Sequence, residues 1–413
     1  MKVYVDNYRY FIDMISTDSN FKSVMHNLIE IDGVISPPNF LTSTFLKNDN
    51  ELNSIDNIKQ TIRNNYHQLF LEHEVVENPE EADIWYIHVQ NINFFELIDK
   101  YEINKKIINN LQLQKCKLLI NIPDDGWFAS KNNNTLENLQ RWLKNNNILE
   151  KNVYVMNLNL ISNERKTEIN MITDTIMSEE YLQGPPKEVC KFDKIDSLFL
   201  NYNRAIKSHK LYLGYSLFNN DLIQNSLFSF NDKYLDNESI GKDYTYFNFK
   251  FDVLYKFLKN LPYKIDNKEL ESMEDQGMIG QMIEHSDYEK TFLSLVSEST
   301  CEEGVVYLSE KTFKPIAMGH PFIIAGSSKS LKKLKEIGYK TFDNWWDESY
   351  DMCDSYKEKI NKIIDILLWL KTKNYKELII IRKEMQEIIN HNFKLFNKRI
   401  NEKNNENSFS NRL

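Results

Sequence analysis

The chain is poor in cysteine: only four occur among its 413 residues, at positions 116, 190, 301 and 353. They are far apart, and no Cys-x-x-Cys pair or Cys/His ligand spacing is present. A zinc module and a disulfide framework are therefore not indicated, and we expect reduced, buried thiols. The chain also has no internal repeat and no long low-complexity region.

Long apolar runs are absent as well. No stretch approaches the roughly 20 apolar residues that a membrane-spanning helix needs. Residues 1–13 alternate in the manner of a strand and do not contain the uninterrupted apolar segment of a signal peptide. We therefore expect a protein without a membrane span that stays in the cytoplasm, or in the host cytoplasm if it is viral.

Positive charge is not in excess, because 51 Lys and Arg residues face 60 Asp and Glu residues and the formal net charge is -9. A nucleic-acid partner is disfavoured, since it would need a locally basic groove set against this balance. The hydrophobic share of 41% and the aromatic share of 13% are those of a folded globular protein. The length favours two domains over one core.

The first half of the chain predicts strands separated by helical stretches. Apolar strand patterns cover residues 2–5, 82–89, 117–122 and 153–158, and a helical pattern covers 136–149. This alternation is typical of parallel βαβ units. Ligands in such sheets lie beyond the carboxyl ends of the strands, so the loop at residues 123–127 is a predicted edge of a cleft.

The pattern loosens between residues 177 and 196, where Gly184, Pro185 and Pro186 interrupt any regular element. We therefore predict an α/β protein with two Rossmann-like lobes. The predicted parts are an N-terminal α/β lobe at 1–180, a C-terminal α/β lobe at 190–353, helices at 354–400 that pack across both lobes, and a polar tail at 401–413.

The second half begins with a predicted strand at 197–202, followed at the start of a helix by Asn203, Arg204, Lys207, His209 and Lys210. A strand, a polar turn and a basic helix start form a layout that suits phosphate. Further strands are predicted at 292–296, 304–308 and 321–325. A helix at 310–318 lies between the last two, which predicts another βαβ unit.

The most informative segment runs from Ser309 to His320. It places the carboxylate of Glu310 and the ammonium groups of Lys311 and Lys314 at the opening of a helix. Backbone N–H groups at a helix start favour anions, lysines add full positive charge, and a carboxylate accepts hydrogen bonds from adjacent sugar hydroxyls. After the helix, Gly319 allows a tight reversal into a buried strand.

The segment from Ser309-Glu310-Lys311-Thr312 to Pro321-Phe322 resembles the donor-binding signature of GT-B glycosyltransferases, especially the fucosyltransferase and exostosin-like groups. The Asn203-Arg204 segment with its following lysines is similar to the Asn-Arg segment of the same families. Residues 293–351 also resemble glycosyltransferase-like proteins of large phages and viruses. The resemblance covers roughly the C-terminal half, and the N-terminal half resembles no family that we recognise.

The resemblance implies that Arg204 and Lys311 neutralise a diphosphate, that Glu310 binds ribose or sugar hydroxyls, and that Glu298 lies close to the donor. It further implies that the lobe at 190–353 binds a nucleotide sugar and that the lobe at 1–180 lies on the acceptor side. The nucleotide sugar would be a co-substrate, and no cofactor is expected. No Asp-x-Asp element occurs, so we expect no divalent metal. The predicted donor-binding residues are Asn203, Arg204, Lys207, Lys210, Glu298, Ser309, Glu310, Lys311, Thr312, Lys314 and His320.

An inverting transfer needs a base that removes the proton of the acceptor hydroxyl, and we expect it on the N-terminal lobe. The predicted candidates are Asp124, Asp125 and His88. None of them lies in a motif, so each has the alternative of an ordinary turn carboxylate or a buried histidine. Glu310 and Lys311 likewise have the alternative of a simple charge pair at a helix start.

The resulting prediction is a metal-independent hexosyl- or pentosyltransferase that moves a sugar from a nucleotide sugar to the hydroxyl of a glycan or another acceptor. Hydroxymethylated viral DNA is the alternative acceptor. Two rival functions remain open at this point. One is a non-catalytic protein that binds a nucleotide or carbohydrate, and the other is a structural component of a virion.

Overall fold

The computed structural model describes most of the second half of the chain and separate parts of the first half. The described residues are 2–5, 74–76, 78–88, 105–122, 135–157, 160–163, 168–173, 188–192, 194–203, 207–231, 247–265, 285–299, 301 and 305–405. The chain divides into two compact units. The first comprises Met1–Asn159, Arg165–Asp174 and Glu406–Leu413, and the second comprises Leu160–Glu164 and Thr175–Asn405.

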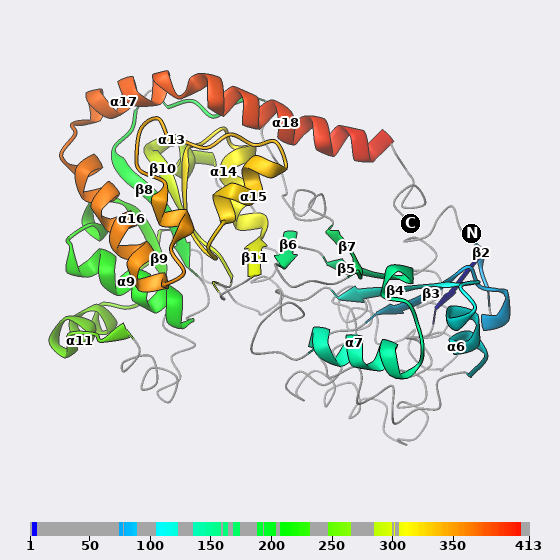
Figure 1. The fold of residues 1–413 in the computed structure, drawn as a ribbon. Helices are drawn as coiled ribbons and strands as arrows, with labels where there is room; N and C mark the ends of the chain where they lie inside the picture. Colours follow the sequence, from blue (N-terminus) through cyan, green and yellow to red (C-terminus); the bar gives the residue numbers. More distant parts are fainter. Residues whose placement is uncertain are drawn as a thin grey trace, which may run out of the picture. The chain divides into compact units, whose positions relative to one another are not determined.

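The first unit contains a parallel sheet with the strand order β2-β1-β3-β4-β5-β7 (Figure 1). The predicted strands of this half are confirmed. Their buried apolar residues pack with two amphipathic helices into one core. The elements are β1 (Lys2–Val5), β2 (Glu74–Val75), η1 (Pro79–Glu81), β3 (Ile84–His88), α6 (Lys105–Gln112), β4 (Lys117–Ile122), α7 (Thr135–Asn145), η3 (Glu150–Asn152), β5 (Val153–Asn157) and β7 (Asn170–Thr173).

The second unit contains a parallel sheet with the order β12-β10-β8-β9. Its strands are β8 (Ser197–Asn203), β9 (Leu227–Phe230), β10 (Thr291–Ser297) and β12 (Phe322–Ala325). Every residue of the inner strand β10 and of the edge strand β12 is buried, as expected for a parallel sheet covered on both faces. Both units are thus α/β with parallel sheets.

One predicted strand has a different partner from the one expected. The segment at 304–308 forms β11 (Val305–Leu308), which pairs antiparallel with β6 (Leu160–Asn163) and not with the parallel sheet. The βαβ unit is formed instead by β10, α14 (Glu310–Ala317) and β12. A short apolar run does not reveal which strand it will pair with, because β11 and its partner are far apart in the sequence.

Helices α9 (Ser208–Asn219) and α16 (Tyr356–Lys371) contact each other, and α14 packs against β10 (Figure 1). The remaining elements of this unit are η4 (Ile223–Asn225), α11 (Phe251–Lys259), α13 (His285–Lys290), α15 (Ser330–Glu336), η5 (Ser349–Met352), α17 (Tyr375–Glu384) and α18 (Gln386–Asn405).

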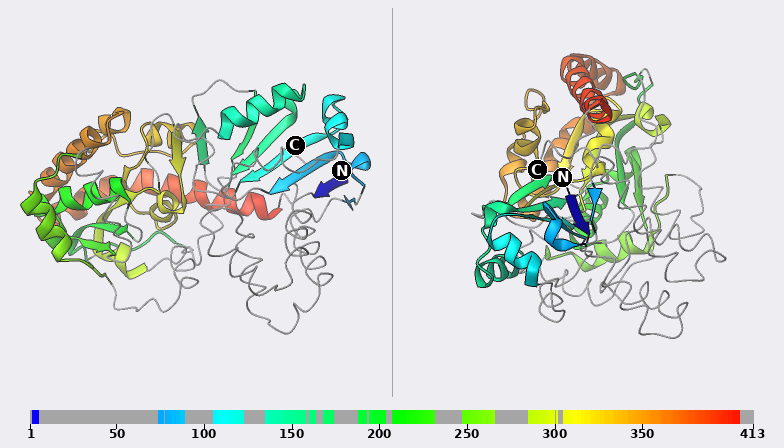
Figure 2. Two further views of the ribbon diagram at one scale, coloured as in Figure 1. Left: turned by 90° about the horizontal axis from the view of Figure 1, so that it is seen from below. Right: turned by 90° about the vertical axis from the view of Figure 1, so that its right-hand side faces the viewer.

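The C-terminal helices belong to the second unit, where α17 contacts β10 and α18 contacts α14 (Figure 2). Their packing across both lobes stays a prediction. The last helix, α18, extends to Asn405, five residues beyond the predicted end of the C-terminal helices, and residues 406–413 of the predicted tail lie outside the described part. None of the described helices is long and apolar enough to cross a membrane.

Candidate functional site

Buried polar side chains gather at the carboxyl ends of three strands of the second sheet. Asn201 and Asn203 lie on one face of β8, Glu298 follows β10 and Ser327 follows β12, and at most 3% of each residue is exposed. After β8 the chain continues to β9 on one side of the sheet, and after β10 it continues to β12 on the other side. The direction of the strand order therefore reverses between the neighbouring strands β8 and β10. A reversal of this kind is where ligands bind in open parallel sheets.

A row of amides links β8 to β10 at this position. The Nδ2 group of Asn201 donates to the carbonyl of Leu295 and to Ser297 Oγ, and Asn203 Nδ2 donates to Asn201 Oδ1. Among the described residues, Asn203 Oδ1 and Ser327 Oγ are buried without a hydrogen-bond partner. Leaving such an atom unpaired costs about 1–3 kcal/mol, so both atoms are suited to meet a polar ligand.

Glu298 joins three elements and is completely buried. Its carboxylate accepts hydrogen bonds from the backbone N–H of Ser309 (3.0 Å), the Ser309 hydroxyl (2.6 Å), the Thr312 hydroxyl (2.6 Å) and the N–H of Ser299 (3.2 Å). Its carbonyl oxygen lies 2.9 Å from His209 Nε2 in α9. Burial raises the pKa of Glu298, although the Lys311 charge and these hydrogen bonds oppose the effect.

Close packing around Glu298 also explains a glycine. A Cβ atom at Gly326 would lie 3.0 Å from Glu298 Cγ and 3.1 Å from Glu298 Cβ, so a side chain there would push against the carboxylate. Glu298 is thus a positioning residue that fixes the starts of α9 and α14 against the ends of β10 and β12.

The predicted helix start at Ser309 is confirmed. Ser309 is the N-cap of α14, and its hydroxyl accepts a hydrogen bond from the N–H of Lys311 at 3.2 Å while donating to Glu298. Glu310 and Lys311 form an ion pair with side chains 22% and 31% exposed. Burial by itself would raise the pKa of Glu310, but the cations of Lys311 and Lys314 outweigh it and hold the pKa below its usual value.

Lysines from two helices converge beside Ser299. Lys207, just before α9, donates to the Ser299 carbonyl at 2.9 Å, and Lys311 from α14 donates to the Ser299 hydroxyl at 3.0 Å. Lys210 is only 4% exposed. Its burial and the nearby charges of Lys311 and Lys207 lower its pKa to about 7, against the opposing effect of the two glutamates.

A further lysine, Lys314, lies one turn beyond Glu310 and is 8% exposed. Burial and the Lys311 charge lower its pKa to about 8, while Glu310 opposes the shift. The group therefore holds more cations than carboxylates in a place sheltered from water. Such an arrangement favours an anion with several oxygens, because an anion would relieve the mutual repulsion of the lysines.

The structure brings together most of the predicted donor-binding residues that it describes, and these are Asn203, Lys207, Lys210, Glu298, Ser309, Glu310, Lys311, Thr312 and Lys314. Arg204, Asp124 and Asp125 lie outside the described residues. His88 is the last residue of β3, and only its backbone is described. The roles assigned to these four residues stay predictions.

His320 does not join this group. It precedes β12 and lies near the amino end of β10, where its ring nitrogens contact Ser294 Oγ and the carbonyl of Thr291, both at 2.9 Å. Burial and the charge of Arg382 lower its pKa well below the usual value, so the ring is neutral. Since the lysines lie at the opposite, carboxyl end of the sheet, His320 acts in packing and the geometry does not support a role in donor binding.

Several residues of the site were not predicted from the sequence. Ser299 and Ser327 are single polar residues near strand ends, without a motif around them, and Asn201 and His209 lie within the predicted Asn-Arg segment and basic helix start but were given no role. For the two serines, the only available signal was their position directly at the ends of predicted buried strands. No three Asp, Glu, His or Cys residues in the described ranges are grouped as a metal site requires.

Comparison with known proteins does not assign this chain to a family. No protein family and no curated protein matches the sequence. The chain is similar to two solved structures. One is the DNA modifying enzyme beta-glucosyltransferase, solved with and without its substrate uridine diphosphoglucose, with 10% identity over 98% of this chain and 96% of that chain and a TM-score of 0.33. The other is a mutant of the T4 phage enzyme in complex with UDP-glucose, with 11% identity over 81% and 84% of the two chains and a TM-score of 0.30. Similarity at this level establishes neither a shared fold nor a shared activity.

Proposed function

We propose that the protein is a glycosyltransferase that moves a sugar from a nucleotide sugar to the hydroxyl of an acceptor without a metal. The supporting observation is the convergence of Lys207, Lys210 and Lys311 at the carboxyl ends of β8 and β10. The reversal of strand order is at the same place, and two buried polar atoms there have no partner among the described residues. A diphosphate with an attached sugar has both the charge and the hydroxyls that this site could bind.

In the proposed reaction, the acceptor oxygen attacks the anomeric carbon and the bond from that carbon to the diphosphate oxygen breaks. The electron pair of the broken bond leaves with the nucleoside diphosphate, and the acceptor proton passes to a base. Negative charge grows on the leaving group as the bond breaks. Fixed cations at Lys207, Lys210 and Lys311 therefore stabilise the transition state more than the bound donor.

The other polar groups would bind the neutral parts of the donor. Glu310 is the proposed acceptor of hydrogen bonds from ribose or sugar hydroxyls. Asn203 Oδ1 and Ser327 Oγ are further proposed contacts, because a donor hydroxyl would supply the partner that each lacks among the described residues. Glu298 acts indirectly, since its carboxylate already accepts four hydrogen bonds, three from Ser309 and Thr312 and one from the N–H of Ser299.

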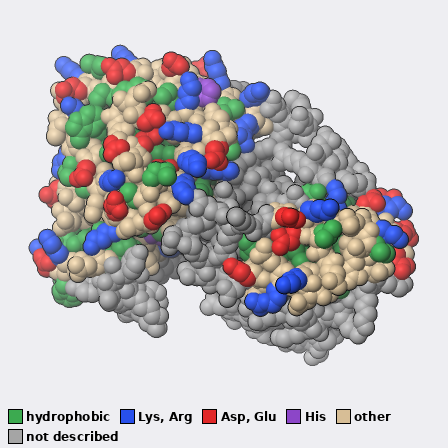
Figure 3. Space-filling view, viewed as in Figure 1, with side chains coloured by type: hydrophobic (Ala, Val, Ile, Leu, Met, Phe, Trp, Pro, Cys, Tyr) green, Lys and Arg blue, Asp and Glu red, His purple; other side chains and the backbone are tan. Residues whose placement is uncertain are grey.

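The proposal keeps Asp124, Asp125 and His88 as candidate bases and Arg204 as a further diphosphate contact. It also keeps the two-lobed GT-B arrangement. A glycan is the preferred acceptor. On the face of the second unit seen in Figure 3, Lys and Arg side chains are interspersed with Asp and Glu. The alternative acceptor, hydroxymethylated viral DNA, would need a basic groove elsewhere.

A thermal-shift panel of UDP, GDP and ADP tests the donor site. A nucleoside diphosphate at about 100 times its dissociation constant should add about 2.7 kcal/mol of stability. If none of the three stabilises the protein, the proposed donor site is wrong and a structural virion component becomes the better assignment. If one stabilises it but the corresponding UDP-, GDP- or ADP-sugars are neither transferred nor hydrolysed, the protein is a non-catalytic binding protein.

A further inference from the structure

Helix α16 contributes two buried side chains to the surroundings of the candidate site. Near its start, the ring of Tyr356 lies edge-to-face with that of His209, with centroids 5.7 Å apart, and His209 contacts the Glu298 carbonyl. One turn later, Lys359 donates a hydrogen bond from Nζ to the carbonyl of Ser327 at 2.8 Å. Through these contacts α16 reaches both the start of α9 and the turn that follows β12.

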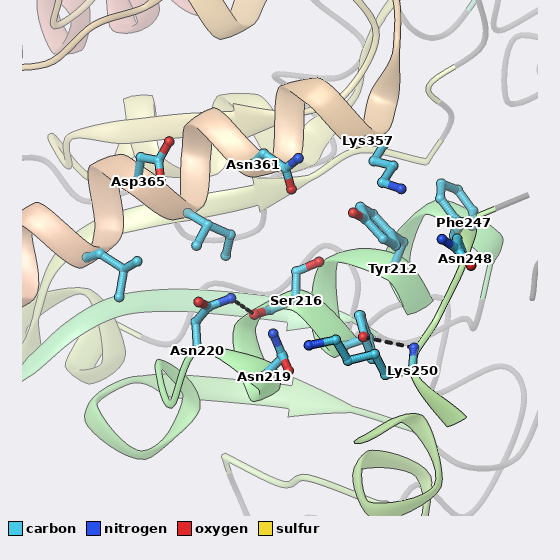
Figure 4. Close-up of a pocket in the computed structure, with 13 residues that line it drawn as sticks. Tyr212, Ser216, Asn219, Asn220, Phe247, Asn248, Lys250, Lys357, Asn361 and Asp365 are labelled. Carbon is cyan, nitrogen blue, oxygen red and sulfur yellow. Dashed lines mark hydrogen bonds between the residues drawn. The ribbon is translucent and has the colours of Figure 1, made fainter. Parts of the chain in front are cut away.

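Lys359 and the exposed polar residues of α16 lie on different faces of the helix. Figure 4 shows Lys357 and Asn361 beside a surface depression between α9 and α16. Lys359 is two residues from each of them, which is about 200° around a helix with 3.6 residues per turn. Its side chain therefore points away from this surface, and only 1% of the residue is exposed.

Burial of the Lys359 ammonium group has an energetic cost. It lowers the pKa of Lys359 to about 8, although the charge of Asp351 opposes the shift. An apolar side chain of similar length would fill the same space without the loss of hydration. It could not donate to a carbonyl, so the hydrogen bond to Ser327 is what distinguishes a lysine at this position.

The main chain of Ser327 is held by two hydrogen bonds. Its carbonyl accepts from Lys359 Nζ and from Ser330 Oγ, both at 2.8 Å. A carbonyl oxygen has two lone pairs, so both are in use. The side chain differs, because Ser327 Oγ is buried without a partner among the described residues. A fixed main chain and an unsatisfied hydroxyl are the features expected of a prearranged ligand contact.

Asp351 holds the other end of the same turn. Its carbonyl accepts a hydrogen bond from the N–H of Lys329, and its carboxylate accepts from the N–H groups of Leu331 and Lys332. The turn after β12 is thus fastened at its end as well as at its start, and the position of its hydroxyl does not depend on β12 alone.

The register of the sheet places Ser327 at the candidate site. Strand β12 pairs with β10 up to Ala325, which lies opposite Ser297. Ser327 and Ser299 each follow this last pair by two residues. Ser327 is therefore at the same end of the sheet as Ser299, the residue on which the lysines of the site converge.

We propose that Lys359 is a positioning residue for the sugar donor: it anchors the main chain of Ser327 so that the Ser327 hydroxyl is directed at a hydroxyl of the donor. This inference rests on the proposed donor site and extends that site to α16. A hydroxyl that is already in place costs less to order when the ligand binds. Loss of the anchor should therefore reduce the affinity even though the serine remains.

The experiment is isothermal titration with UDP-glucose, GDP-mannose and ADP-glucose, followed by titration of variants with the nucleotide sugar that the wild type binds. Lys359→Met removes the hydrogen bond and keeps the length of the side chain. It should weaken binding about three- to tenfold, the usual effect of losing one neutral hydrogen bond, and Ser327→Ala should do the same. The double variant should bind no more weakly than Ser327→Ala, because the anchor has no further effect once the hydroxyl is absent.

The matched control is Lys371→Met. Lys371 also lies on α16 and donates to a backbone carbonyl, that of Asp221, at 2.8 Å, but it is about 18 Å further along the helix axis. This control should bind as the wild type does. Ser330→Ala removes the second hydrogen bond to the Ser327 carbonyl, so its effect should likewise disappear in the Ser327→Ala background. It tests the anchor without relying on the folding of Lys359→Met.

An unchanged dissociation constant in Lys359→Met would overturn the proposal. So would an equal weakening with and without the Ser327 hydroxyl, since the lysine would then act by its charge. A loss only in the number of binding sites per chain would indicate a role in folding and would also overturn it. A wild type that binds none of the three nucleotide sugars contradicts the donor site itself, whereas a wild type that binds one with an affinity independent of Lys359 contradicts this inference alone.

Discussion

Among single residues, Lys311 connects most of the proposed donor site. Its ammonium group contacts Ser299 Oγ and Glu310, and its backbone N–H is capped by Ser309. Lys311→Ala removes the charge but keeps the cap. We expect it to abolish sugar transfer and to weaken binding of a nucleoside diphosphate about 10- to 100-fold, the usual loss for a hydrogen bond to a charged group.

Isothermal titration with the nucleoside diphosphate that stabilises the protein measures this loss. The matched control is Lys333→Ala. Like Lys311, Lys333 forms an ion pair with a glutamate, but it lies on α15, away from the proposed site. The control should bind as the wild type does. Equal affinity in Lys311→Ala would remove Lys311 from the site. We also expect Arg204→Ala to be inactive in sugar transfer. A transfer assay of this variant tests the proposed role of Arg204.

Lys210 makes the affinity for an anion depend on pH. Burial and the charges of Lys311 and Lys207 lower the pKa of Lys210 to about 7, although Glu298 and Glu310 oppose the shift. Burial lowers the pKa of the neighbouring His209 to about 3, so this histidine is neutral. Only the protonated lysine attracts an anion, and a bound anion raises its pKa. The affinity should therefore fall as the pH rises above about 7, by at most tenfold per pH unit for each proton taken up.

Titrations of the nucleoside diphosphate at pH 6.5, 7.5 and 8.5 measure this slope. Lys314, whose pKa burial lowers to about 8, adds a smaller contribution of the same sign. Lys210→Met removes one titrating group, so its slope should be shallower and its affinity at pH 6.5 lower. A wild-type affinity that stays constant over this range would show that Lys210 does not change its protonation on binding.

At the scale of elements, the turn between α14 and β12 depends on Gly319. Its φ angle of 62° lies in the left-handed region, and a Cβ atom there would meet Val189 Cγ1 at 2.5 Å. Gly319→Ala should therefore lower the free energy of unfolding by more than about 1–2 kcal/mol, the cost of the left-handed conformation alone. Urea denaturation measures the loss.

A second variant separates the two causes. Gly319→Ala combined with Val189→Ala relieves the contact but not the backbone strain, so part of the loss should return relative to Val189→Ala alone. An undiminished stability in the single variant would contradict the turn geometry. Because the turn positions β12 beside β10, the same variant should also weaken binding at the strand ends.

Local sequence patterns predicted the helix start at Ser309, the buried strands and the basic start of α9, because caps and apolar runs depend on near neighbours. Pairing partners were less accessible: Val305–Leu308 was assigned to the parallel sheet but pairs with β6. His320 was predicted near the lysines since it follows the same helix. The crossover through α14 instead returns the chain to the amino end of the sheet, a consequence of parallel topology.

At the scale of the whole molecule, each of the two compact units has its own buried core. Units with separate cores can unfold in separate transitions. Differential scanning calorimetry should therefore resolve two transitions. Leu139 is a completely buried residue of α7, so Leu139→Ala should destabilise the first unit by about 2–5 kcal/mol. Only the transition of the first unit should then move to a lower temperature, which identifies that transition.

The lysines proposed to bind the diphosphate all belong to the second unit. A nucleoside diphosphate at about 100 times its dissociation constant should therefore raise the transition of the second unit by the equivalent of about 2.7 kcal/mol and leave the other transition unchanged. At the same ligand concentration, Lys311→Ala should reduce this shift to about 0.4–1.4 kcal/mol, because its affinity is 10- to 100-fold lower, while the unliganded transition stays in place. A ligand that raised the transition lowered by Leu139→Ala would place the nucleotide on the first unit, because binding stabilises only the cooperative unit that holds the ligand.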